Sequence, residues 1–223
     1  MFLVCGLTLL YLTGITDDLI GVRYRQKFVI QILCACFFSI AELWINDLYG
    51  LLGIYAIPNW IGIPFTILTI VFITNAINLI DGIDGLASGL SSVALLVFGL
   101  LFIEKGLWMY SMLAFSTLGV LVPFFYYNVF GNAERARKIF MGDTGSLTLG
   151  YILSFLAIKY SQNNPEVISN TKGTFLIAFS TLIIPAFDVI RVVMVRLRNG
   201  KSPFEPDKNH IHHKFLAMGF TPR

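Results

Sequence analysis

The sequence predicts an all-α membrane protein, a polytopic transmembrane helix bundle with about seven membrane segments. Of its 223 residues, 56% are hydrophobic and only 13% are charged, whereas soluble domains carry about 25% charged residues. Long apolar runs that are almost free of charge recur along the chain, as expected for helices that cross a bilayer. No linker or repeat divides these runs, so residues 1–223 are expected to form a single membrane domain.

The apolar runs define the expected helices. The first, at 2–15, is short of the roughly 20 apolar residues that a span requires, and it is expected to be the end of a helix whose beginning is missing. Fuller segments follow at 28–45, 62–80, 86–103, 107–127, 147–160 and 173–195. Continuous apolar runs indicate helices, because the strands of a membrane β-barrel alternate between apolar and polar residues.

The basic residues indicate how the chain is oriented. The net charge is +3, and the bases lie in short loops between apolar runs, which argues against nucleic-acid binding. One set of alternate loops is rich in lysine and arginine and is therefore expected to face the cytoplasm. It contains Arg23, Arg25, Lys27, Arg135, Arg137, Lys138, Arg196, Arg198, Lys201, Lys208 and Lys214, whereas the opposite set has only Lys105, Lys159 and Lys172.

Adjacent carboxylates stand at the end of the first run, at Asp17 and Asp18. Paired acids at a helix end are unfavourable unless a cation or base balances them. Such a pair can bind Mg²⁺, or one member can act as a base. Alternatively, the pair lies in a solvated loop and balances the nearby arginines.

A second cluster combines amides and acids. Asn75 and Asn78 are three residues apart on one helix face, inside an apolar run where unpaired amides are costly. Asp81 and Asp84 follow, each before a glycine. A helix end with a tight turn explains the glycines, but it leaves two acids with no base close to them in the sequence. A function therefore explains this cluster better.

Two further clusters complete the candidate site. Phe140, Gly142 and Asp143 precede the run at 147–160, where Asp143, Thr144 or Ser146 could cap the helix or an acid could hold a metal-bound phosphate. The last cluster contains every histidine of the chain, at His210, His212 and His213. Its spacing does not match common structural zinc sites, and phosphate binding or acid–base chemistry fits as well. Surface histidines without a role remain an alternative.

All of these clusters fall in the loops assigned to the cytoplasmic side. Carboxylates, glycines and bases gathered at one membrane face suit a metal-bound diphosphate. A cation-coupled transporter is the alternative class, but its acids are expected near the midplane, between broken helices. Farther along, Asp188 and Arg191 have the spacing of a helical ion pair.

In this order, the clusters resemble the polyprenyl-phosphate N-acetylhexosamine-1-phosphate transferases, known as glycosyltransferase family 4. The resemblance runs from Asp17 to His213 and implies Mg²⁺, or Mn²⁺, as the cofactor. It implies that Asp17, Asp18, Asp84, His212 and His213 are catalytic and that Asp143 binds the metal. It also implies that substrates contact Lys27, Asn75, Asn78, Asp81, Phe140, Gly142 and His210.

The resemblance further implies a UDP-sugar donor and an undecaprenyl phosphate acceptor. The reaction would release UMP and start a cell-envelope glycan, at the cytoplasmic face of a bacterial inner membrane. The His-Ile-His-His sequence at 210–213 favours a donor such as UDP-GlcNAc over the phospho-MurNAc-pentapeptide transferase branch, which usually has three consecutive histidines. A homodimer is expected by resemblance alone. The resemblance also implies that family helices before residue 1 and after residue 223 are missing, so the chain is expected to be a fragment. Whether this fragment is active without those helices is left open. A non-catalytic remnant is a third alternative, beside the transferase and the transporter.

Overall fold

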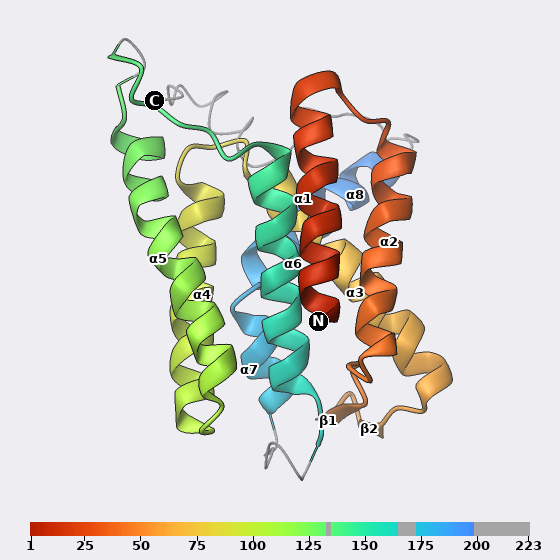
Figure 1. The fold of residues 1–223 in the computed structure, drawn as a ribbon. Helices are drawn as coiled ribbons and strands as arrows, with labels where there is room; N and C mark the ends of the chain where they lie inside the picture. Colours follow the sequence, from red (N-terminus) through yellow and green to blue (C-terminus); the bar gives the residue numbers. More distant parts are fainter. Residues whose placement is uncertain (133–134, 165–172, 199–223) are drawn as a thin grey trace.

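The structure is a computed structural model, and it describes residues 1–132, 135–164 and 173–198. The described chain is an all-α, polytopic membrane helix bundle with one small β-hairpin (Figure 1). The helices are α1 (Phe2–Ile20), α2 (Tyr24–Ile40), α3 (Asn59–Ile80), α4 (Leu86–Glu104), α5 (Trp108–Phe130), α6 (Gly142–Ser161), α7 (Thr174–Ser180) and α8 (Ile183–Arg198). The hairpin pairs β1 (Asp47–Leu51) with β2 (Ile54–Ala56) in antiparallel fashion and was not expected from the sequence.

Within the part of the chain that the structure describes, four helices are long and apolar enough to cross a membrane: α1, α3, α4 and α5. The α7–α8 pair gives a fifth candidate if it is counted as one broken span. The run at 2–15 therefore belongs to a helix of 19 residues that continues to Ile20. The helix α2 has only 17 residues, and α6 has a polar beginning, so length and composition do not bring the count to seven.

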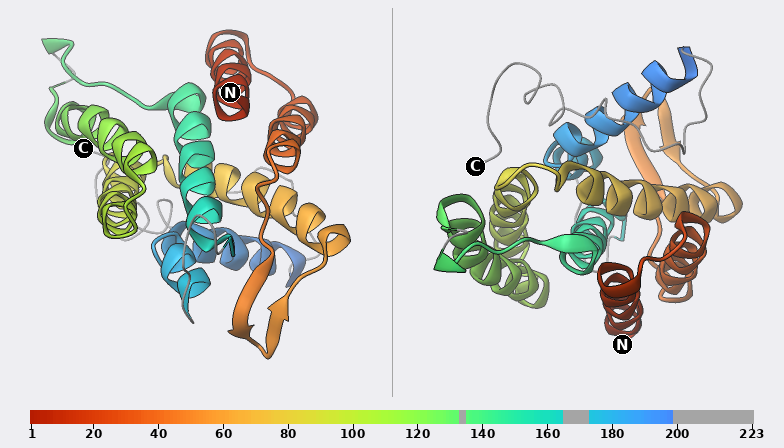
Figure 2. Two further views of the ribbon diagram at one scale, coloured as in Figure 1. Left: turned by 60° about the horizontal axis from the view of Figure 1, so that its bottom comes forward. Right: turned by 90° about the horizontal axis from the view of Figure 1, so that it is seen from above.

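Helix α6 lies at the centre of the bundle, with α1 and α3 as its main partners (Figures 1 and 2). Twelve of its 20 residues are buried, which explains why it can be less apolar than a helix that faces lipid. Its apolar side chains join both buried clusters of the described chain: Leu153 and Leu156 contribute to one, and Tyr151 and Ile158 to the other.

Close backbone packing sets the depth at which α1 and α3 meet α6. A Cβ atom on Gly14 would lie 2.3 Å from the Cα atom of Thr144, and one on Gly150 would lie 2.7 Å from the Cα atom of Thr74. Small residues at such crossings let two backbones approach each other. Both contacts lie about one helical turn from the acidic and amide residues of α1 and α3, so they fix the distances between those residues.

A sharp bend separates α7 from α8, whose axes differ by 73°. The sequence predicts a single apolar segment at 173–195, and the structure divides it into two helices. Pro185 explains the break, because its ring clashes with the carbonyl of the residue four positions earlier, Thr181, and it provides no N–H group. As a result α8 crosses α3 and runs outward (Figure 2).

The end of the bundle that carries the hairpin is closed by hydrogen bonds between two loops. The side-chain amide of Asn46 donates to the carbonyl of Asn163 (2.8 Å) and accepts from its backbone N–H (2.7 Å). The side chain of Asn163 also donates to Asp47 (2.9 Å), and the Tyr49 hydroxyl donates to the carbonyl of Ser161 (3.1 Å). We call this set the hairpin latch. It ties the hairpin to the end of α6.

Candidate active site

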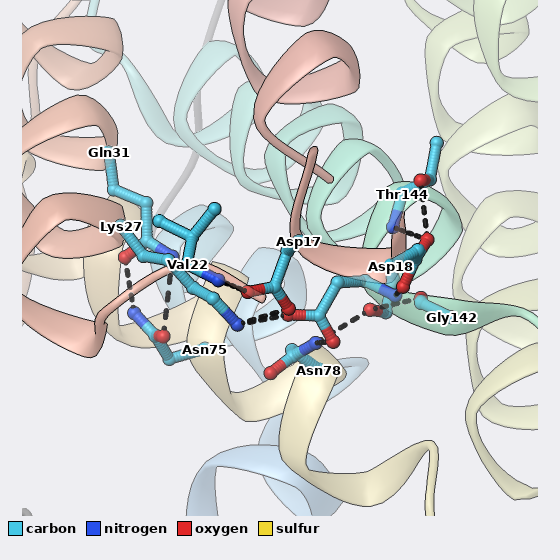
Figure 3. A network of polar contacts seen from close by, with 11 residues as sticks. Asp17, Asp18, Val22, Lys27, Gln31, Asn75, Asn78, Gly142 and Thr144 are labelled. Atoms are coloured by element: carbon cyan, nitrogen blue, oxygen red, sulfur yellow. Dashed lines mark hydrogen bonds and ion pairs between the residues drawn. The ribbon is translucent and has the colours of Figure 1, made fainter. Parts of the chain in front are cut away.

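The candidate site lies at the end of the bundle opposite the hairpin, where the C-terminal ends of α1 and α3 meet the N-terminal ends of α2 and α6 (Figures 1 and 3). The structure brings together the acids of the first cluster, the amides of the second and Asp143 of the third. These residues are far apart in the sequence. Their convergence follows from the close α1–α6 and α3–α6 packing.

Lys27 stands at the middle of the group. Its ammonium donates to Asp17 Oδ2 at 2.6 Å and forms a second, very short ion pair with Asp143 Oδ2. The other oxygen of Asp17 accepts the backbone N–H of Val22 at 2.6 Å. One lysine on α2 thus joins carboxylates from α1 and α6, and it is this lysine, rather than the arginines expected from the sequence, that balances Asp17.

Asp18 caps α6 from another helix. Its Oδ1 accepts the backbone N–H of Asp143 (2.9 Å), and its Oδ2 accepts the backbone N–H (3.1 Å) and hydroxyl (2.6 Å) of Thr144. No side chain of α6 itself caps this end, so the alternative of a local cap is wrong. Gly142 has φ +62°, and a Cβ atom there would lie 2.8 Å from Asp18 Oδ2. The glycine therefore leaves room for the carboxylate.

The two amides of α3 have different partners. Asn78 donates to Asp143 Oδ1 at 3.0 Å and to the Ser146 hydroxyl at 2.8 Å. Asn75 forms a reciprocal amide pair with Gln31 of α2, at 2.5 and 3.3 Å. Gln31 is 2% exposed, and sequence reasoning missed it. Its place four residues after Lys27 puts both side chains on one face of α2, but no local pattern in the sequence pairs Gln31 with Asn75 of α3.

Asp84 belongs to a second ion pair. The Lys138 ammonium binds its carboxylate, and the Asn128 amide lies 3.5 Å from it. No base lies close to Asp84 in the sequence, but the fold compensates its charge with Lys138, from a loop 54 residues later. The same ammonium lies 5.6 Å from the ring centroid of the exposed Phe140. Sequence reasoning did not identify Lys138 or Asn128 as site residues.

Asp81 remains without a hydrogen-bonding or ion-pair partner for its carboxylate among the described residues. Burial, together with the smaller effect of the negative charges of Asp143, Asp84 and Asp18, raises the pKa of Asp81 to about 7. Loss of water and nearby like charges both disfavour the ionised form. Near neutral pH, this group can hold or release a proton next to the other acids.

The acidic group is suited to a divalent cation. Asp17, Asp18 and Asp143 each offer a carboxylate oxygen, and these oxygens lie within 4.8 Å of one another. Carboxylate oxygens are the ligands that Mg²⁺ prefers. The ammonium of Lys27 already places a positive charge between Asp17 and Asp143, so the donor set holds a cation at this position. His210, His212 and His213 lie outside the described residues.

Apolar grooves run between the described helices, and two of them are considered in turn. One lies between α3 and the α7–α8 bend, has a volume of about 340 Å³ and contains Leu68, Phe72, Ile73 and Ile183 in its lining. The other lies between α5 and α6, has a volume of about 540 Å³ and includes Val120. Leu68 and Ile183 are 66% and 59% exposed, so the first groove, here called the α3–α8 groove, is open on the outside of the bundle.

Comparison with known proteins supplies the family. Residues 1–161 match the family described as Glycosyl transferase family 4. The undecaprenyl-phosphate alpha-N-acetylglucosaminyl 1-phosphate transferase of Yersinia pestis is 31% identical over 225 residues, which cover 100% of this chain and 60% of that protein. The protein of the same name from Salmonella typhi is 32% identical, with 100% and 59% covered.

A probable undecaprenyl-phosphate N-acetylglucosaminyl 1-phosphate transferase of Bacillus subtilis is 33% identical over 227 residues, with 98% of this chain and 58% of that protein covered. The chain thus spans about 60% of the length of the curated relatives it matches. Since the family match extends over most of the sequence and includes Asp17, Asp18, Asn75, Asn78 and Asp143, the chain belongs to glycosyl transferase family 4.

Proposed function

We propose that the protein transfers a sugar-1-phosphate, most simply GlcNAc-1-phosphate, from a UDP-sugar to undecaprenyl phosphate and releases UMP. The observation that carries the proposal is the convergence of Asp17, Asp18, Lys27, Asn78 and Asp143 at one end of a membrane bundle. The names of the relatives support the acceptor and the transferred sugar. The basic residues at 22–27 and 135–138 support a site that faces the cytoplasm.

Both reactants are anionic, so the site must offset the repulsion between them. We assign a bound Mg²⁺, or Mn²⁺, to Asp143 with Asp17, where it would neutralise charge on the donor diphosphate. Lys27 supplies a positive charge on α2 for the phosphate of the acceptor, and Asn78 fixes the rotamer of Asp143. Holding the two phosphates in line then supplies much of the rate.

The paired aspartates have separate roles in this proposal. Both oxygens of Asp18 are used by the N-terminus of α6, so Asp18 positions Asp143 and Thr144. Asp17 keeps Oδ2 directed at Lys27, where it can help to hold the metal and so orient the acceptor phosphate. The attacking oxygen of the acceptor forms a bond to the β-phosphorus of the donor, the bond to the bridging oxygen breaks, and UMP leaves.

The prenyl tail of the acceptor is assigned to the α3–α8 groove. Its lining is almost entirely apolar and includes Ile73, which lies two residues before Asn75 on α3. Ala186→Trp at the lining should raise KM for undecaprenyl phosphate more than KM for the UDP-sugar. Val120→Trp, in the α5–α6 groove, is the matched control. If both variants change the KM for undecaprenyl phosphate equally, the prenyl tail does not bind in the α3–α8 groove.

The function is tested by measuring UMP released from UDP-GlcNAc in membranes that contain undecaprenyl phosphate and Mg²⁺. The full-length Yersinia pestis relative serves as the positive control for the assay. Lipid- and Mg²⁺-dependent UMP that is lost in Asp143→Asn, with the variant still present in the membrane, supports the proposal. UMP from the relative but none from this chain, with several UDP-sugars supplied, counts against a transferase activity of this chain.

A further inference from the structure

We propose that Lys27 is an exchangeable internal counter-ion: its ammonium and a divalent cation compete for the same oxygens of Asp143 and Asp17, and metal binding frees Lys27 to bind a phosphate. The inference deepens the proposed function and rests on its assignment of a metal to Asp143. It is carried by the position of the ammonium, which stands between carboxylates of α1 and α6 (Figure 3).

The hydrogen bonds of the acidic group show which oxygens can change partner. Asp17 Oδ1 is used by the backbone of Val22, and Asp143 Oδ1 by the Asn78 amide. Both oxygens of Asp18 are used by the N-terminus of α6. The remaining oxygens, Oδ2 of Asp17 and Oδ2 of Asp143, are those that hold Lys27.

A metal that takes these two oxygens leaves every backbone hydrogen bond of the site in place, and it displaces only the ammonium. The two cations cannot share the position, because the ammonium donates along the same oxygen lone pairs and like charges at such short range repel strongly. Metal binding is therefore an exchange of one cation for another. The affinity for the metal is lowered by the free energy needed to remove Lys27 from its two partners.

The chemistry of lysine suits this exchange. Its charge is compact and sits on a flexible stem of four carbons with three donors, and Lys27 occupies the first turn of α2 with its side chain 23% exposed. Once released, the ammonium remains beside the site and is available to an anionic phosphate. Metal binding thus adds the charge of the ion and also frees a second cation, so metal and phosphate should bind cooperatively.

The first test compares Mn²⁺ affinities of the full chain in detergent, measured by electron paramagnetic resonance. Lys27→Met should bind Mn²⁺ up to about fivefold more tightly than wild type, since a solvent-accessible ion pair shifts an equilibrium by up to about that factor. Lys138→Met is the matched control. It removes an equal charge from the neighbouring ion pair with Asp84 and should change the affinity by less than about twofold.

The second test uses the wild-type protein, so it does not depend on the folding of a variant. Acetylation by an amine-reactive reagent is followed by mass spectrometry at Lys27 and Lys138, with and without Mn²⁺. The proposal expects the ion to accelerate acetylation of Lys27 several-fold and to leave Lys138 unchanged. An unchanged or slower rate at Lys27, in protein that binds Mn²⁺, overturns it.

The outcomes separate this inference from the function on which it rests. Mn²⁺ binding that is lost in Asp143→Asn but equal in wild type and Lys27→Met overturns the exchange and leaves the metal assignment standing. Mn²⁺ binding that is unaffected by Asp143→Asn overturns both. Inorganic phosphate should tighten Mn²⁺ binding in wild type and lose most of this effect in Lys27→Met, which a purely structural lysine would not produce.

Discussion

At the scale of single residues, the site contains two kinds of side chain. Some can exchange their partners for a ligand, and others hold their neighbours in place. Asp17 and Asp18 are neighbours in the sequence, yet their carboxylates have different partners. Asp17 accepts a hydrogen bond from Lys27, and Asp18 accepts one from the backbone at the start of α6. The difference arises because successive residues on a helix point about 100° apart. The pair therefore presents one carboxylate to Lys27 and the other to the backbone of Asp143.

Removing the cap should destabilise the protein. In Asp18→Ala the N–H groups of Asp143 and Thr144 lose their acceptor, and loss of a helix cap lowers the free energy of unfolding by about 1–2 kcal/mol. Asp18→Asn keeps one oxygen acceptor and should recover about half of that loss. The apparent unfolding temperature in detergent measures both. Equal unfolding temperatures for Asp18→Ala and wild type would contradict the role of the cap.

Asp81 should make stability depend on pH in a known direction. Its pKa of about 7 in the folded protein lies above the value of 3.8 for an unburied aspartate, so the folded state holds a proton that the unfolded state has released. The stability from this group is complete below about pH 4 and declines as pH rises to about 7. Relative to wild type, Asp81→Asn should gain about 2 kcal/mol across this range, after allowance for solvent screening.

This comparison is made by thermal unfolding of both proteins at a series of pH values. A chelator in the buffer keeps divalent cations from lowering the pKa of the site carboxylates. If the difference in stability between wild type and Asp81→Asn stays flat from pH 4 to pH 7, Asp81 is ionised throughout and the account of its burial is wrong.

The residue types of the site could be predicted from the sequence, because acids and amides at the ends of apolar helices are costly without a partner. Their partners could not. Lys27 and Asp143 are 116 positions apart, and so are not paired by any local pattern. Lys138 and Gln31 were missed for the same reason: what selects them is the packing of helices, which the period of a sequence does not encode.

At the scale of elements, the apolar runs predicted the helices well and their ends less well. The run at 28–45 became a helix that begins at Tyr24 and ends at Ile40, since the basic first turn also adopts helical geometry. Pro185 was visible in the sequence, but its effect, a 73° bend, depends on whether α7 and α8 find separate places to pack. The β-hairpin was not predicted because its residues lack the alternation of apolar and polar side chains that is typical of strands.

The glycine contact between α1 and α6 should tolerate no side chain. Gly14→Ala would place a Cβ atom against the backbone of Thr144, which cannot rotate away as a side chain can. We expect the free energy of unfolding to fall by about 1–3 kcal/mol, together with weaker Mn²⁺ binding, because Asp17 and Asp18 would shift away from α6.

Gly119→Ala, in α5 with open space around it, is the matched control and should be as stable as wild type. Stable Gly14→Ala protein with normal Mn²⁺ affinity would show that the contact does not position the site.

At the scale of the whole molecule, two polar networks close opposite ends of one bundle. The hairpin latch joins β1 to the end of α6, and the acidic site joins α1, α2 and α3 to its beginning. The 20 residues of α6 separate the two networks by about 30 Å, at 1.5 Å per residue. Substitutions at sites so far apart usually have additive effects on stability.

Asn46→Ala should therefore separate stability from metal binding. It leaves the backbone N–H and carbonyl of Asn163 without their partner, and unsatisfied groups of this kind cost about 1–3 kcal/mol when buried. The apparent unfolding temperature should fall, while the dissociation constant for Mn²⁺ stays within about twofold of wild type. A larger change in the Mn²⁺ constant would show that the two ends of α6 are coupled.

The central place of α6 also has a consequence for how the chain enters the membrane. A helix that begins with Gly-Asp-Thr-Gly-Ser and contains Lys159 is a poor candidate for partitioning into lipid alone. Its main partners, α1 and α3, precede it in the chain and are apolar enough to insert first. During synthesis, α6 can then leave the translocation machinery and pack directly against α1 and α3, which are already in the membrane. We therefore expect the order of the helices along the sequence to be an order of assembly as well.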